Sequence, residues 1–196
     1  AYGRLMKALF KRQATGEGEC IHQSMFESAV SWLTVPITFT ASFGQHITRR
    51  GNTHEFFCPV SVYRTADGFI YLAVGNDRQW KSLVGLEIFR SLDRPEYEKN
   101  AGRIKDVQNM NRLINDITRQ HSSDELIRLL HSITLPVSKI QTISEVITDP
   151  LVDRRLLFAD DPVTGTTITL APPPYISPFV NASGRRLSFP PRFGEH

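Results

Sequence analysis

Hydrophobic residues in the first part of the chain recur at the spacing of an α-helix. Within residues 2–15 two pairs of apolar side chains lie four positions apart, and lysines and arginines occupy positions between and beside them. This pattern predicts an amphipathic helix whose apolar face carries Leu5, Met6, Leu9 and Phe10. Gly16 follows directly, and because glycine readily takes the left-handed conformation that ends a helix, we expect the helix to stop there.

The next segment changes from a short strand-like stretch to a second helical pattern. Residues 19–24 predict a strand, and Ser24 with Glu27 forms a capping-box sequence, in which each side chain bonds the other residue's amide. A helix should therefore begin here and be perturbed at Pro36, because proline removes a backbone donor. A helix, a glycine turn, a strand and a helix within ~40 residues indicate an α/β fold class.

A hairpin follows a polar segment. Residues 43–59 show no periodicity, which is typical of a linker or an exposed loop. Residues 60–64 then alternate in polarity, residues 66–68 form a turn sequence, and residues 69–74 return as a second strand. This combination predicts an antiparallel β-hairpin.

The remainder of the chain is predicted to be mainly helical before it becomes rich in proline. Periodicity and capping residues predict helices at 77–88, 101–120, 122–130 and 142–157, and strands at 135–141 and 162–170. Residues 171–179 predict extended chain, because proline cannot donate to a sheet ladder. The predicted organisation is an α/β segment at 1–43, a connector at 44–58, a small α+β domain at 59–170 and a proline-rich tail at 171–196.

Charge gives little indication of a nucleic-acid partner. The net charge is +3 and the pI is near 9.0, and no run of basic residues exceeds a pair, as at 49–50, 154–155 and 185–186. Nucleic-acid binding favours a denser basic stripe with interleaved aromatic residues, so a solvated surface is the favoured interpretation. The arginine pairs remain suited to an anionic, phosphate-bearing ligand.

Composition and residue spacing argue against a disulfide-rich, secreted, membrane-spanning or metal-binding protein. Cys20 and Cys58 are the two cysteines, and their wide separation favours free thiols in a reducing, cytoplasmic compartment. No apolar stretch approaches the ~18 residues of a membrane span, no signal peptide is apparent, and the histidine spacings predict no metal site. Because Ala1 already lies in a predicted helix and no closing element is apparent at the other end, we expect both ends to be cut from a longer protein.

Two polar segments are candidate functional loops, each with an ordinary structural alternative. In "RRGNTHE", Gly51 before Asn52 allows the backbone to approach a ligand closely, or the segment is only a flexible connector. In "GNDRQW", Asn76 and Asp77 end a predicted strand, where they either begin a helix or face a binding partner. The residue pattern leaves both alternatives open.

Taken in order, several segments resemble the class III CoA-transferase family, which includes formyl-CoA transferase, carnitine CoA-transferase and α-methylacyl-CoA racemase. The segments are "ALFKRQATGEGECIHQSMFES", "RRGN", "YRTADGFIYLAVGNDRQW", "NAGR", "LPVSKIQTISEVITDP" and "FPPRFGEH". Each is weak alone, but the ordered set covers nearly the whole chain. The resemblance implies the middle and later part of a subunit, with part of a Rossmann-like large domain and a small α+β domain.

The resemblance also implies covalent catalysis by an aspartate. In the family its carboxylate attacks an acyl-CoA thioester, the released thiolate forms an aspartyl-CoA thioester, and a carboxylic acid acceptor then takes the coenzyme A. Coenzyme A is thus a substrate, and no permanently bound cofactor is implied. The matching position lies upstream of Ala1, so we expect the catalytic residue outside this sequence and the fragment alone to be inactive. The alternatives are a racemase-type enzyme, which exchanges an α-proton, and a non-catalytic, truncated dimerising subunit.

Site residues and assembly follow from the same resemblance. Gly51 and Asn52 correspond to a mobile glycine-rich loop that covers the aspartate, and Asp77, next to Asn76, lies where the racemase branch carries an acid across the dimer. Family dimers are interlocked, and residues 44–58 and 171–196 would serve as the long connectors. We therefore expect a homodimer, or pairing with the missing half, that covers the apolar helix faces.

Overall fold

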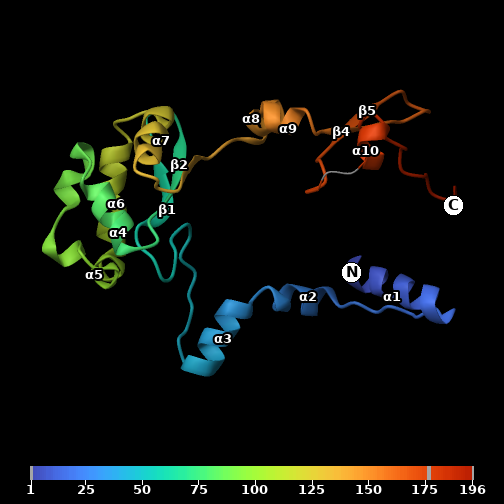
Figure 1. Cartoon of the computed structure of the whole chain (residues 1–196), viewed down its shortest axis with the longest axis horizontal. Coiled ribbons are helices and arrows are strands. Elements are labelled where there is room, and N and C mark those ends of the chain that lie inside the picture. The colour runs from blue at the N-terminus through green and yellow to red at the C-terminus, as the bar shows by residue number, and fades with distance from the viewer. Residues whose placement is uncertain (1, 176–177, 196) are drawn as a thin grey trace. The chain divides into compact units, whose positions relative to one another are not determined.

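The structure is a computed structural model that describes residues 2–175 and 178–195. The chain divides into two units, residues 1–56 and 57–196. The first unit contains three helices, which Figure 1 shows in blue: α1 (Tyr2–Thr15), α2 (Met25–Ser31) and α3 (Thr34–Phe43). The predicted first helix is confirmed, and Gly16 takes the left-handed conformation expected at its end.

The first unit departs from the predicted pattern between α1 and α3. The predicted strand at residues 19–24 is wrong, because this segment is irregular and pairs with no strand of the described chain. Ser24 does cap α2, since its side chain accepts a hydrogen bond from the Glu27 amide at 3.2 Å. The second helical pattern breaks at Trp32 and Leu33. Pro36 then lies in the first turn of α3, where its missing amide costs no intrahelical bond.

An antiparallel sheet organises the first part of the second unit. The predicted hairpin is confirmed as β1 (Val60–Arg64) and β2 (Phe69–Ala73), with Tyr63 opposite Ile70. The third strand, β3 (Val137–Lys139), pairs with β2, so the strand order is β1-β2-β3. Alternation places Tyr63, Ile70 and Leu72 in the core, because successive side chains of a strand point to opposite faces.

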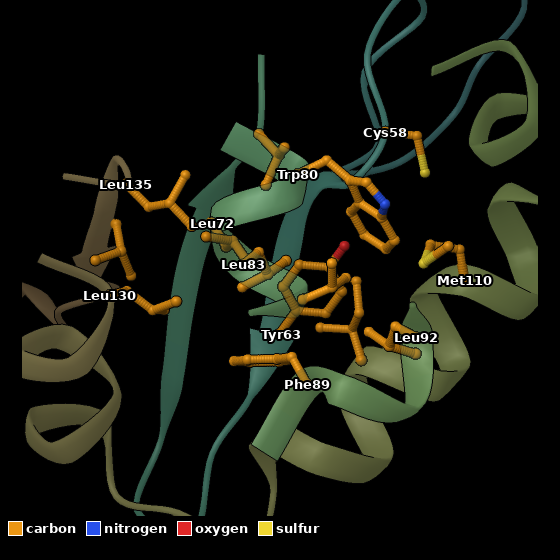
Figure 2. Packing of buried hydrophobic residues seen from close by; sticks show 14 of the residues in the cluster. Cys58, Tyr63, Leu72, Trp80, Leu83, Phe89, Leu92, Met110, Leu130 and Leu135 are labelled. Carbon is orange, nitrogen blue, oxygen red and sulfur yellow. The ribbon is translucent and has the colours of Figure 1, made fainter. Parts of the chain in front are cut away.

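Helices cover this sheet and complete its core. They are α4 (Asp77–Val84), two 3₁₀ segments η1 (Glu87–Leu92) and η2 (Pro95–Tyr97), α5 (Asn100–Lys105), α6 (Val107–Thr118) and α7 (Ser123–Ser132). The core side chains shown in Figure 2 come from both the sheet and these helices and include Trp80, Leu83, Phe89, Met110 and Leu130. Burying each such side chain is worth about 1.5–3 kcal/mol, which makes this cluster the main stabilising element of the fold.

The helix predicted at residues 101–120 is interrupted. Asp106 leaves helical conformation and separates α5 from α6. Its carboxylate accepts hydrogen bonds from the Tyr97 hydroxyl and from the Asn109 side chain at 2.9 Å. Both helices still pack toward the core, because Ile114 of α6 belongs to the buried cluster and Ile104 of α5 packs against it.

The C-terminal lobe, residues 143–195, carries a second sheet. It contains α8 (Ile143–Thr148), α9 (Pro150–Asp153), β4 (Leu157–Asp160), β5 (Thr167–Leu170), α10 (Pro178–Ala182) and β6 (Arg186–Leu187). The strand order is β5-β4-β6, with β5 antiparallel and β6 parallel to β4. Thr142 forms the expected cap of α8 as a full capping box.

Two expectations for this lobe are wrong in part. The helix predicted over residues 142–157 ends at Asp149, which instead caps α9. The tail predicted as extended at residues 171–179 is irregular as far as residue 175 but begins helix α10 at Pro178, because proline suits the first turn of a helix. Residues 176–177 of that prediction lie outside the described residues.

Burial differs sharply between the two units. Among the described residues of the first unit, Ala8 is the one buried hydrophobic residue. Phe10, Phe26 and Trp32 are each more than three-quarters exposed. The second unit holds the whole of the packed cluster. No helix among the described residues has the length and apolar character needed to cross a bilayer.

Candidate functional site

The segment "GNDRQW" follows β2 and starts α4. Asn76 is the N-cap, because its side-chain oxygen accepts a hydrogen bond from the Gln79 amide at 2.9 Å. The Gln79 side chain in turn accepts from the Gly75 amide at 2.7 Å. These bonds satisfy donors that a helix N-terminus leaves free, so Asn76 begins the helix, and its role toward a partner stays a prediction.

Asp77 faces into its own unit and meets Arg103 of α5. The Arg103 Nη2 donates to Asp77 Oδ1 at 2.8 Å, and the Arg103 side chain is fully buried. Arg103 Nε donates to the carbonyl oxygen of Cys58 at 2.7 Å, and Nη1 donates to those of Tyr97 at 2.8 Å and Glu98 at 3.0 Å. A buried charge is tolerated only when it is paired and hydrogen-bonded, and Arg103 meets both conditions.

The Arg103 guanidinium also lies over an aromatic ring, and Asn100 of the same motif "NAGR" makes further contacts. The guanidinium carbon is 4.9 Å from the centre of the Trp80 ring, a distance at which the ring attracts a cation. Asn100 joins the network through its amide, which donates to Asp77 Oδ1 at 3.0 Å, and through its side chain, which accepts from the Cys58 amide at 3.1 Å. The segments "NAGR" and "GNDRQW" therefore meet around Arg103.

Gly102 explains why this junction closes so tightly. A Cβ at this position would lie 1.9 Å from the carbonyl oxygen of Glu96, which is well inside van der Waals contact. Arg103, Asn100 and Gly102 were assigned no function from the sequence. The feature that could have indicated a buried arginine is the position of Arg103 next to Ile104 on a predicted helix, within the motif "NAGR".

The electrostatics of the junction are those of a structural ion pair. The hydrogen bond from Arg103 is the main reason that the pKa of Asp77 lies below its usual value, and partial desolvation opposes it. Burial raises the pKa of the Cys58 thiol to about 11, against the opposing effect of the Arg103 charge. Because thiolates and not thiols are nucleophilic, Cys58 is an inert core residue.

A cavity of about 670 Å³ opens beside Asp77 and Trp80, a size typical of small-molecule sites. Its wall mixes charges of both signs, chiefly Asp77, Arg78, Lys81, Arg94, Glu98 and Lys99. No nucleophile and base are paired among these side chains. Nor do the described residues gather three side chains able to hold a metal ion. The size and the mixed charges of the cavity are suited to binding a small polar molecule.

The second candidate segment belongs to the other unit. Gly51 takes a positive φ of 63° in an exposed turn, and the Thr53 amide donates to the Arg50 carbonyl across it at 3.3 Å. Arg50 also pairs with Glu55. Gly51 and Asn52 thus form a compact turn of the first unit, and their role as a loop over an active site stays a prediction.

Comparison with known proteins decides what kind of chain this is. The sequence pattern of CoA-transferase family III matches residues 1–196. The chain belongs to this family. Its mixed helix and sheet architecture confirms the expected α/β class, and a CaiB/BaiF family protein from Brucella suis superimposes with a TM-score of 0.72 at 25% identity, covering 89% of this chain and 46% of that one.

Curated family members give the same assignment. The chain is 28% identical over 176 residues to a succinyl-CoA:mesaconate CoA-transferase of Haloarcula hispanica, covering 87% of this chain and 43% of the relative. It is 29% identical over 194 residues to a succinate–glutarate CoA-transferase of Agrobacterium fabrum, covering 98% and 48%. This chain therefore spans somewhat less than half the length of these relatives.

Proposed function

We propose that this chain is part of a CoA-transferase that moves coenzyme A from an acyl-CoA to a small carboxylic or dicarboxylic acid through an aspartyl-CoA intermediate. One observation carries the proposal: the family pattern matches the chain throughout. The relatives above are named for transfer between succinyl-CoA or succinate and the dicarboxylic acids mesaconate and glutarate. Those names favour a transferase over a racemase-type enzyme.

The nucleophilic aspartate lies in the part of the relatives that this chain does not match. Three carboxylates of the second unit support this assignment, because their oxygens already accept hydrogen bonds. Asp77 accepts from Arg103, Asp67 accepts from Thr65 and Ser123, and Asp161 accepts from Arg192. A carboxylate held by several donors is stabilised in its charged form and is correspondingly a weak nucleophile.

In this proposal the chain supplies the small domain, a loop and assembly surfaces. Gly51 and Asn52 form the loop over the aspartate, and Asn76 and Asp77 approach the active site across an interlocked dimer. Exposed apolar residues on α1 and α2, such as Phe10 and Phe26, support burial against a second subunit or the remaining half. Two free cysteines support a reducing, cytoplasmic location.

Adduct mapping tests the proposal directly. A longer enzyme containing this chain, incubated with succinyl-CoA and then digested, should carry coenzyme A on an aspartate outside residues 1–196. The 196-residue chain alone should give no adduct and no acceptor-dependent exchange. An adduct on a carboxylate of this chain would disprove the assignment of the nucleophile. Deuterium uptake at the α-carbon without an acceptor would show α-proton exchange and would instead favour the racemase-type alternative.

A further inference from the structure

Three arginines of the C-terminal lobe line one cavity of about 250 Å³: Arg154, Arg155 and Arg185. Arg154 and Arg155 follow α9, whereas Arg185 precedes β6. The fold therefore brings one arginine pair together with a third arginine that lies ~30 residues further along the chain, well beyond the usual length of a single loop. Tyr175 and Asn181 add polar groups to the same wall.

Two of these guanidinium groups are held in place by backbone. Arg155 Nη2 donates to the Pro173 carbonyl at 2.6 Å, and Arg185 Nη1 donates to the Asp153 carbonyl at 2.7 Å. The Arg185 guanidinium also lies 5.4 Å from the centre of the Phe158 ring. Each guanidinium has five N–H donors, so one or two backbone bonds leave others for a ligand while the side chain is already ordered.

Among the described residues, no carboxylate in the cavity wall offsets the charge of these arginines. Carboxylates are absent from its lining, and within the described part of the chain none of the three arginines forms an ion pair. Neighbouring arginines of the lobe behave differently, because Arg186 pairs with Asp160 and Arg192 pairs with Asp161. Three cationic groups thus line one cavity for which the described residues supply no counter-ion.

Backbone strain at the same place supports a binding role. Arg185 has a φ of 67°, a left-handed conformation that is unfavourable for a residue with a side chain. Such strain persists where the surroundings enforce it, and it is concentrated at ligand sites. The side chain of the same residue, Arg185, donates a hydrogen bond to the Asp153 carbonyl and lies over the Phe158 ring.

We propose that this cavity binds a phosphate group. A phosphate presents several oxygens to guanidinium groups that approach from different sides, and arginine forks match this geometry. Its double negative charge also offsets more of the local positive charge than a single carboxylate does. The proposal is independent of the CoA-transferase assignment, and the phosphate comes either from the free ion or from a nucleotide.

Calorimetric titration of the purified chain tests this site. Sodium phosphate should bind saturably against a sodium chloride reference at equal ionic strength. The double substitution R154Q/R155Q should weaken binding at least tenfold, because each lost charge-assisted hydrogen bond costs roughly tenfold. The matched control R90Q/R128Q removes the same charge from exposed arginines elsewhere and should stay within about twofold of the unsubstituted chain.

A second variant and a second ligand complete the test. R154K/R155K keeps the charge but loses the guanidinium fork, so intermediate weakening supports the site even if the glutamine variant disturbs the lobe. Adenosine 3′,5′-bisphosphate binding more tightly than phosphate identifies a nucleotide source, and equal binding identifies the free ion. Absence of saturable binding, or equal weakening by the matched control, overturns the proposal.

Discussion

Arg103 is fully buried and donates to Asp77 at 2.8 Å, although Asp77 itself keeps 42% of its side chain exposed. The pair joins the start of α4 to α5, and its arginine also binds three backbone carbonyls, among them that of Cys58 just before the sheet. Removing the arginine therefore leaves several acceptors without a partner, whereas removing the carboxylate leaves most of the network intact. The two partners should contribute unequally to stability.

Substituting Arg103→Met should lower the free energy of unfolding by about 3 kcal/mol, because loss of one member of a buried pair leaves the other groups without a hydrogen-bond partner. Asp77→Asn should cost clearly less, since an amide oxygen still accepts the bond and water screens the exposed carboxylate. Urea unfolding in a Trp32→Phe background would measure both effects, because Trp80 then remains as the single tryptophan of the chain. Equal losses for the two variants would contradict the central role given to Arg103.

Gly102→Ala tests the close approach of α5 to the backbone at Glu96. The new methyl group would lie 1.9 Å from a carbonyl oxygen that cannot rotate away, so the backbone must shift, at a cost of roughly 1–3 kcal/mol. Gly68→Ala is the matched control, because its Cβ would meet nothing nearer than 3.9 Å. The same fluorescence assay should show the loss only at Gly102, and equal midpoints would argue against the tight junction.

The stability of the sheet should depend on acid through Asp67. The amide and hydroxyl of Ser123 and the hydroxyl of Thr65 donate to its carboxylate, and the Ser123 amide is the main reason that its pKa falls to about 2. A carboxyl group with a lowered folded-state pKa stabilises the fold above its unfolded value, which is near 3.9. This contribution is lost as the pH falls from about 4 to 2.

Comparison with Asp67→Asn isolates that contribution. Both proteins contain the other carboxylates, so the difference between their unfolding free energies should shrink steadily from pH 5 to pH 2. Urea titrations at each pH, followed by Trp80 fluorescence, would measure the difference. A difference that is constant over this range would show that the Asp67 charge does not stabilise the fold.

Local sequence signals predicted the second unit well. The hairpin at β1 and β2 has clear alternation and a turn at Asp67, and the caps at Asn76 and Thr142 act within four residues of sequence. Such features are decided by neighbouring residues. The break at Asp106 was missed because the side chain of Tyr97, outside the helical pattern, bonds its carboxylate.

Features that depend on residues far apart in the sequence could not be predicted from local patterns. No local pattern indicated that Arg103 is buried, yet its partners lie 5 to 45 positions away in the sequence. The strand predicted at residues 19–24 lacks a neighbouring strand in the described chain, and a strand requires one to pair its backbone groups. The arginine cavity depends in the same way on the pairing of β4 with β6, which no local pattern indicates.

The two cysteines should differ in reactivity. Cys58 is 1% exposed and its pKa is raised to about 11 by burial, whereas Cys20 is exposed. Brief treatment of the native chain with a maleimide at neutral pH should therefore label Cys20 alone, because the thiolate is the reactive form. Mass spectrometry should find one adduct in the native protein and two in denaturant. Rapid native labelling of Cys58 would show that the core around it opens.

The apolar face of α1 should drive association of the isolated chain. Leu5 and Leu9 are about half exposed and Phe10 is 77% exposed, and an exposed apolar surface of this kind favours burial against another protein. We expect light scattering to give a mass above the 22.2 kDa of the single chain. The double substitution L9E/F10E should lower that mass, because charges within the contact would be desolvated on association.

Lys7→Glu on the same helix is the control, since Lys7 is exposed and lies off this apolar face. It changes the net charge by the same two units as L9E/F10E and should leave the mass unchanged. The measurement also separates two kinds of contact: addition of ~0.5 M salt screens charge–charge attraction but strengthens or preserves apolar burial. Association that survives salt and is lost in L9E/F10E would identify the α1 face as an interface. A monodisperse monomer for the unsubstituted chain would show that this face needs no partner, and would remove the support that it gives to an interlocked assembly.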